Sequence, residues 1–155
     1  MTKTLILLIA PILVVSVAAT AGADAADHHA RGMATLDIIV GGDVQRRLDS
    51  LTDIAPELGT WIADFAYGDV VSRPGLDLRT RELATVAALT ALGNAQPQLK
   101  AHINGALNAG CTPTEVIEVI MQMAVYAGFP ASLNGISAAR EVFAERNITV
   151  ENAAK

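Results

Sequence analysis

The sequence contains a single cysteine, Cys111, which excludes a disulfide bond within the chain. Its place directly before Thr112-Pro113 favours a small, partly buried apolar residue; the alternative, a reactive or intermolecular thiol, requires exposure to solvent. Aromatic residues are also scarce, at 4%, although 52% of the 155 residues are hydrophobic. Ala, Leu, Ile and Val therefore supply most of the apolar mass, which favours close-packed helices over a sheet sandwich. The length predicts one domain.

Positive charge is scarce too, since 11 Lys and Arg residues stand against 16 Asp and Glu residues, a formal net charge of −5. This balance excludes the basic surface of a nucleic-acid-binding protein. The sequence contains no Gly-rich phosphate loop, no zinc-ligand spacing and no local Ser-His-Asp grouping. His28 and His29 are adjacent and lack a spaced partner, so we predict no metal site there. The polar segment 26–32 around them is expected to be a loose end of the mature chain.

The first 25 residues resemble an export signal. Lys3 provides a positive charge, residues 5–19 are almost continuously apolar, and small residues at 21–25 offer cleavage sites. The apolar run is shorter than the roughly 20 residues of a membrane-spanning helix, which favours cleavage over an uncleaved anchor. We therefore predict a signal peptide over residues 1–25 and a mature domain over residues 26–155. That domain is expected in the periplasm or outside the cell, without a membrane partner.

Apolar residues recur at helical spacing through most of the remaining chain. The pattern predicts an all-α, oligomeric domain of about six helices, over residues 43–51, 53–67, 78–92, 96–109, 113–126 and 131–146. Asp43 and Asp77 are expected N-caps, and Thr112-Pro113-Thr114-Glu115 is a capping box. The helix that this box opens is apolar on most of its circumference, so we predict that another subunit covers one face. Trp61 and Phe65 are expected in the core or a subunit contact, a ligand-facing role being the alternative.

One acid and one base lie within these apolar runs. Glu82 is in the helix expected over 78–92, and His102, the only histidine outside the N-terminal pair, is in the next helix. They are the first candidates for acid–base chemistry. The alternative is structural: an ion pair of Glu82 with Arg79 or Arg81, and a hydrogen-bonded helix histidine. Arg79 and Arg81 oppose the dipole at a helix N-terminus, so each is expected to meet a carboxylate or an anionic ligand. Arg73, just before Pro74-Gly75, is either a solvated loop charge or an anion contact at a cleft mouth.

Four blocks of the chain form a specific combination: GMATLDIIVGGDVQRRL, FAYGDVVSRPGLDLRTRELATVAALTALG, LKAHINGALNAGCTPTEVIEVIMQMAVYAGFPA and AAREVF. Together they resemble the γ-carboxymuconolactone decarboxylase family, over residues 32–143. The resemblance implies an all-helical fold related to that of alkyl hydroperoxidase D, assembled as homotrimers or homohexamers. It also implies a carbon–carbon lyase of aromatic-compound catabolism that removes a carboxylate from a small lactone without a cofactor or metal.

Carried onto this sequence, the resemblance implies that His102 donates a proton and that Glu82 orients it or keeps it protonated. Gln98 stands where the family often has an acid, and it is a candidate hydrogen-bond donor to the lactone oxygen. Arg73, Arg79 and Arg81 are expected to bind the substrate carboxylates, because a guanidinium group offers paired donors.

Two alternatives to a decarboxylase belong to other functional classes. Thiol peroxidases of this fold carry Cys-x-x-Cys between the acid and the histidine, but residues 94–101 contain no cysteine, which disfavours a thiol-dependent hydroperoxidase. An exported relative that binds a ligand without catalysis is the second alternative. Gln98 favours it slightly, because an amide cannot donate a proton as a carboxylic acid does.

Overall fold

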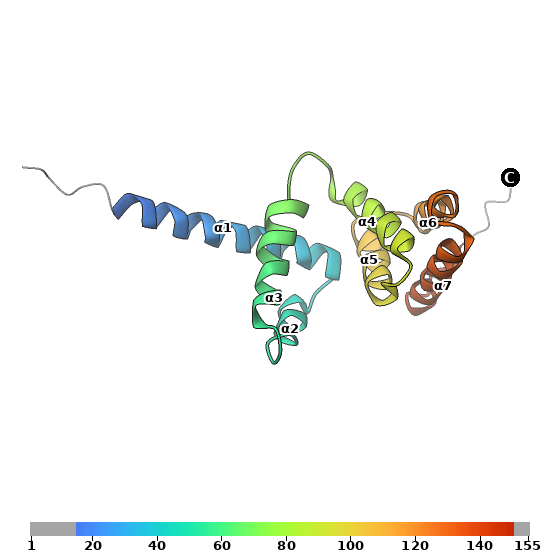
Figure 1. Cartoon of the computed structure of the whole chain (residues 1–155), viewed down its shortest axis with the longest axis horizontal. Coiled ribbons are helices and arrows are strands. Elements are labelled where there is room, and N and C mark those ends of the chain that lie inside the picture. Colours follow the sequence, from blue (N-terminus) through green and yellow to red (C-terminus); the bar gives the residue numbers. More distant parts are fainter. Residues whose placement is uncertain (1–14, 151–155) are drawn as a thin grey trace, which may run out of the picture.

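The structure, a computed structural model, describes residues 15–150, with side chains from residue 27 onwards. Its elements are α1 (Val15–Val40), α2 (Val44–Asp49), α3 (Pro56–Thr60), the π-helix η1 (Trp61–Val71), α4 (Leu78–Leu92), α5 (Gln96–Asn108), α6 (Pro113–Ala127) and α7 (Phe129–Glu145) (Figure 1). No strand occurs among the described residues. The predicted all-α fold class is therefore confirmed.

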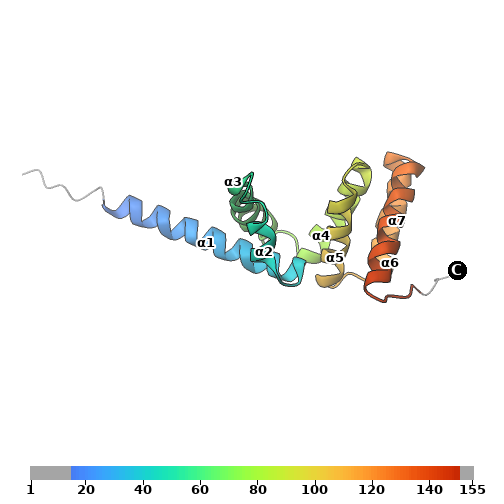
Figure 2. The same ribbon diagram turned by 90° about the horizontal axis from the view of Figure 1, so that it is seen from below.

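The helices form two groups that meet where α1 packs on α5. Helices α4 to α7 lie together at one end of the molecule, and α1, α2, α3 and η1 make up the other end (Figures 1 and 2). The larger core belongs to the α4–α7 group and includes the fully buried side chains Val86, Ile103, Val116, Ile120 and Val142. A smaller cluster of Leu36, Val44 and Ala63 holds the other group together. The candidate acid and base lie on α4 and α5, near the junction of the two groups.

Local capping chemistry sets the starts of α4 and α6 as the sequence predicts. The Asp77 side chain accepts a hydrogen bond from the Thr80 backbone N–H, at 2.6 Å. At α6, the Thr112 hydroxyl accepts from the Glu115 N–H at 3.2 Å, and the Glu115 carboxylate accepts from the Thr112 N–H at 2.8 Å. Both contacts of the capping box are thus present.

Asp43 does not cap α2 as predicted. Its backbone is in the left-handed region, with φ of 59°, and its carboxylate makes no capping hydrogen bond. The carboxylate pairs with Arg46 one turn further along instead. Because the preceding Gly41 and Gly42 also have positive φ, the chain reverses sharply here and the Asp43 side chain is directed away from the free N–H groups.

The expected loose segment 26–32 is part of α1, so this prediction was wrong. The contacts that order it come from residues far along the chain: His28 Nδ1 lies 2.6 Å from Asp69 and His29 Nδ1 lies 2.6 Å from Asp64, both on η1. The two helices approach closely at Gly32, where an added Cβ would be 1.8 Å from the carbonyl oxygen of Ala63. No pattern in the local sequence predicts that these two helices cross.

The helix predicted over 53–67 is divided into α3 and η1, and it continues past Gly68 to Val71. Gly68 does not end the helix. Its lack of a side chain instead lets η1 pack closely on α1, since a Cβ at this position would lie 2.4 Å from the His28 carbonyl oxygen. The turns here are wider than those of an α-helix, because the Ser72 N–H donates to the Tyr67 carbonyl five residues earlier. Trp61 and Phe65 are each 63% exposed, so they are not in the core of this chain.

Helix α6 is buried on one face only within the single chain. Val116, Ile120 and Met123 point into the core, whereas Val125 and Tyr126 are 78% and 76% exposed. The prediction that a second subunit covers this apolar face stays a prediction.

The predicted signal peptide falls largely outside the described residues, because residues 1–14 are not described. None of the helices within residues 15–150 is both long enough and apolar enough to cross a bilayer. The expected cleavage point after Ala25 lies within the backbone of α1. Cleavage and export stay predictions from the sequence.

Candidate active site

A buried carboxyl group lies at the centre of the candidate site. Glu82, on the second turn of α4, is only 2% exposed. It fits against α5 because position 105 is a glycine: a Cβ on Gly105 would lie 2.6 Å from Glu82 Oε2. Burying a carboxylate is costly unless it is hydrogen-bonded, so its partner matters.

That partner is His102, whose Nδ1 lies 2.9 Å from Glu82 Oε2. The structure thus brings together two groups that are twenty residues apart in the sequence. An ionised carboxylate only accepts hydrogen bonds, so with Glu82 ionised Nδ1 carries the proton of this contact. The His102 side chain is 24% exposed, which leaves part of the ring accessible. A fixed imidazole with one accessible side is suited to proton transfer.

The accessible side of His102 borders a cavity of about 390 Å³. This volume lies within the range of small-molecule sites. The lining comes from both groups of helices and consists of Ile39, Val40, Gly41, Arg47, Tyr67, Ala101, His102, Asn104, Asn108 and Arg146.

Tyr67, on η1, brings a neutral hydroxyl to this cavity. Burial, and then the negative charge of Glu82, raise the pKa of Tyr67 to about 12. The phenol therefore stays protonated at neutral pH and can donate a hydrogen bond. Sequence reasoning missed Tyr67, because it is neutral and lies on a different helix from Glu82 and His102.

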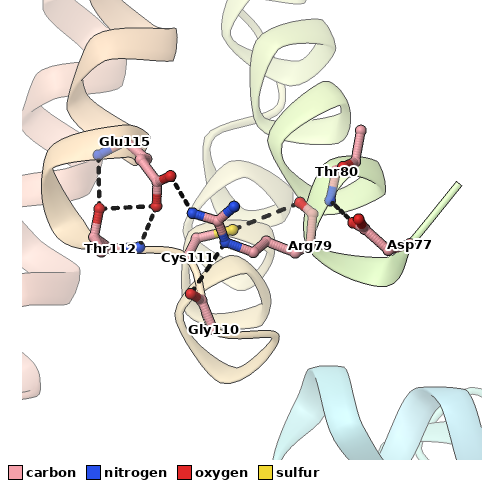
Figure 3. Close-up of polar contacts among 7 residues, drawn as sticks. All are labelled: Asp77, Arg79, Thr80, Gly110, Cys111, Thr112 and Glu115. Carbon is pink, nitrogen blue, oxygen red and sulfur yellow. Dashed lines mark hydrogen bonds and ion pairs between the residues drawn. The ribbon is translucent and has the colours of Figure 1, made fainter.

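The three arginines predicted to bind substrate carboxylates do not line this cavity. Arg79 pairs with Glu115 and donates from Nε to the Gly110 carbonyl at 3.2 Å, joining α4 to α6 (Figure 3). Arg81 donates to the Arg73 carbonyl at 2.9 Å, and its Nε is buried without a hydrogen-bond partner. Arg73 borders a separate hollow of about 350 Å³ near Pro74. Their role in binding substrate stays a prediction. The arginines that line the His102 cavity, Arg47 and Arg146, were not among the sequence candidates.

Gln98 and Cys111 also lie outside the cavity. Gln98 is exposed on α5, one turn before His102. Cys111 is buried, with Sγ 3.5 Å from the Arg79 carbonyl oxygen, and burial raises the pKa of its thiol (Figure 3). Cys111 was expected to be a partly buried apolar residue, and the structure buries it almost completely. No group of three or more metal-binding side chains occurs in the described part of the chain.

The fold and the site define a small all-helical protein in which a buried glutamate holds a partly exposed histidine at a cavity between helix groups. The chain belongs to the carboxymuconolactone decarboxylase family, whose sequence profile matches residues 56–141. The resemblance seen in the sequence is thereby confirmed.

Relatives with assigned activities share the decarboxylase class. The chain is 40% identical to a 4-carboxymuconolactone decarboxylase of Acinetobacter baylyi over 112 residues, which are 72% of this chain and 83% of that protein. It is 31% identical to a nitrosuccinic acid decarboxylase of Metarhizium robertsii over 100 residues, 64% of this chain and 69% of that protein. An uncharacterised 15.0 kDa protein of Paracoccus denitrificans is 34% identical over 99 residues, 63% and 74% of the two chains. These names support decarboxylation as an activity of the family.

Proposed function

We propose that the protein is a cofactor-independent decarboxylase that acts on γ-carboxymuconolactone or a similar small carboxylated lactone. The observation that carries the proposal is the hydrogen bond between buried Glu82 and His102 at the wall of the cavity. The names of two relatives support the type of reaction. Both names describe acids that also contain an electron-withdrawing group, a lactone or a nitro group, which can take up the electrons left by carbon dioxide.

In the proposed reaction, the bond between a lactone carbon and its carboxylate breaks and carbon dioxide leaves. The electron pair of that bond is delocalised onto the lactone oxygen, so the substrate is its own electron acceptor. The imidazolium of His102 then donates its proton to carbon, and a proton from water restores it. Because Nδ1 is bound to Glu82, the proton that is transferred comes from Nε2.

Glu82 and Tyr67 have supporting roles in this proposal. The Glu82 carboxylate fixes the orientation of the His102 ring through the contact with Nδ1. The Tyr67 hydroxyl, which stays protonated, can donate a hydrogen bond to the oxygen on which negative charge develops.

The test is release of carbon dioxide from γ-carboxymuconolactone by the purified protein. We expect His102→Ala to lower kcat by about 10²–10⁴-fold, the usual contribution of a general acid. Glu82→Gln keeps the shape of the side chain but removes its charge, and is expected to lower kcat as well.

A matched control is His29→Ala, because His29 also pairs with an acid, Asp64, but lies outside the cavity. This variant should keep wild-type turnover. Full activity in His102→Ala would show that this imidazole is not the proton donor.

A ligand-binding protein without catalysis is the second candidate, favoured by Gln98 in place of an acid. It predicts that the purified protein binds the lactone but releases no carbon dioxide. A thiol-dependent hydroperoxidase has less support, because Cys111 is buried and has no Cys-x-x-Cys partner.

A further inference from the structure

Two arginines line the cavity beside His102, and neither pairs with an acid among the side chains of residues 27–150. Arg47, on α2, makes no side-chain hydrogen bond or ion pair in this range. Arg146 follows α7, and within residues 27–150 its side chain hydrogen-bonds to neutral oxygens. The cavity therefore holds two positive charges that lack an acidic partner among the described side chains.

Arg146 is held in place by one of its nitrogens. Nη1 donates to the Asn108 side chain at 3.0 Å, to the Asn104 carbonyl at 3.2 Å and to the Asn104 side-chain oxygen at 3.4 Å. Asn108 is itself anchored to α1, where its amide donates to the Ile39 carbonyl at 2.8 Å. The Nη2 and Nε donors of Arg146 have no partner among the described side chains. A guanidinium that is positioned through one nitrogen and open on its other two donors matches the two oxygens of a carboxylate.

We infer that Arg47 and Arg146 together bind the carboxylate that the substrate keeps, and so select small acids with a second carboxylate. This inference rests on the proposed decarboxylation. An ion pair to the departing carboxylate would stabilise the ground state more than the transition state, because that charge disappears during the reaction. An ion pair to the retained carboxylate is equally strong in both states. It anchors the substrate beside His102 without raising the barrier.

The first test is binding of glutarate, a small dicarboxylate, measured by isothermal titration calorimetry. We expect Arg47→Met and Arg146→Met each to weaken binding at least tenfold. The neutral analogue glutaramide should bind the wild type at least tenfold more weakly than glutarate. Arg140→Met is the matched control: Arg140 is an exposed arginine on α7 that borders a different cavity. Equal glutarate affinity in all four proteins would overturn the inference.

The second test separates the retained carboxylate from the departing one. With γ-carboxymuconolactone, Arg47→Met and Arg146→Met are expected to raise KM at least tenfold while kcat changes little. A rise in kcat would mean that the arginines hold the departing carboxylate, which overturns the inference. Arg146→Met also loses its contacts with two asparagines, so folding is checked by circular dichroism. Arg47→Met has no such contacts to lose, and it decides the question if the other variant unfolds.

The two proposals fail in different ways. Arginine-dependent binding of glutarate without release of carbon dioxide would remove the proposed decarboxylase activity but keep the anion site. Release of carbon dioxide with an unchanged KM in both arginine variants would remove the anion site but keep the activity.

Discussion

At the scale of single residues, the sequence reveals the isolated acid and base but not the other side chains that line the same cavity. Glu82 and His102 can be found because they are isolated ionisable groups within apolar helical runs. Arg47, Arg146 and Tyr67 cannot be found in this way, because they lie on α2, just after α7 and on η1, and only the folded chain brings them to one cavity. The local sequence does not predict which of these side chains lie close together in the fold.

A substitution at Gly105 tests how the position of Glu82 depends on a single neighbouring residue. In Gly105→Ala the new Cβ would lie 2.6 Å from both Glu82 Oε2 and Ile39 Cγ2, so the carboxylate must move away from His102. We expect a loss of roughly 1–3 kcal/mol in unfolding free energy, as is usual for overpacking. Turnover should fall together with it. Chemical denaturation and carbon dioxide release measure the two effects.

Gly75→Ala is the matched control, because no atom lies within 4 Å of a Cβ at that position. It should change neither quantity by much. If Gly105→Ala kept wild-type stability and turnover, the carboxylate would not depend on the space that Gly105 leaves.

At the scale of elements, helix starts were predictable where one side chain caps its own helix, as at Asp77 and Thr112. They were not predictable where the contact comes from elsewhere. The π-helical turns of η1 and the helical form of segment 26–32 depend on the crossing of α1 and η1 at Gly32 and Gly68. That crossing joins residues more than thirty positions apart.

A substitution at Glu115 tests the contacts between elements, because Glu115 caps α6 and joins it to α4. Hydrogen bonds from the Thr112 N–H, from Arg79 and from the Thr112 hydroxyl lower the pKa of Glu115 from 4.5 to about 2. Since the folded-state pKa is lowered, the stabilisation is complete above pH 4.5 and disappears as the pH falls towards 2. Glu115→Gln should therefore lower the melting temperature at pH 7, and the difference from wild type should shrink between pH 4.5 and pH 2.

The control for this experiment is Glu118→Gln, an exposed glutamate on the same helix. It removes the same charge from α6 without removing a cap. An equal loss of stability in both variants at pH 7 would assign the effect to net charge and not to the contacts of Glu115.

At the scale of the whole molecule, composition and the helical spacing of apolar residues together predicted the all-α fold. The number of subunits was implied only by the family resemblance, and trimers or hexamers remain our proposal. The exposed apolar side chains Val125 and Tyr126 near the end of α6 are consistent with a covered face in an assembly.

Tyr126→Glu places a charge on this face and is expected to lower the oligomeric state, as measured by sedimentation velocity. Leu92→Glu is the control, since Leu92 is an exposed apolar residue at the end of α4. The same sedimentation coefficient for wild type and Tyr126→Glu would argue against a subunit contact at this position.

The crossing of α1 and η1 has a consequence for insertions and deletions. Gly32 and Ile39 are seven residues apart on one helix, about two turns, so a single stripe of α1 both meets η1 and forms a wall of the cavity. One inserted residue between them would rotate that wall by about 100° relative to the crossing. Their spacing is thus constrained independently of the residues that fill it.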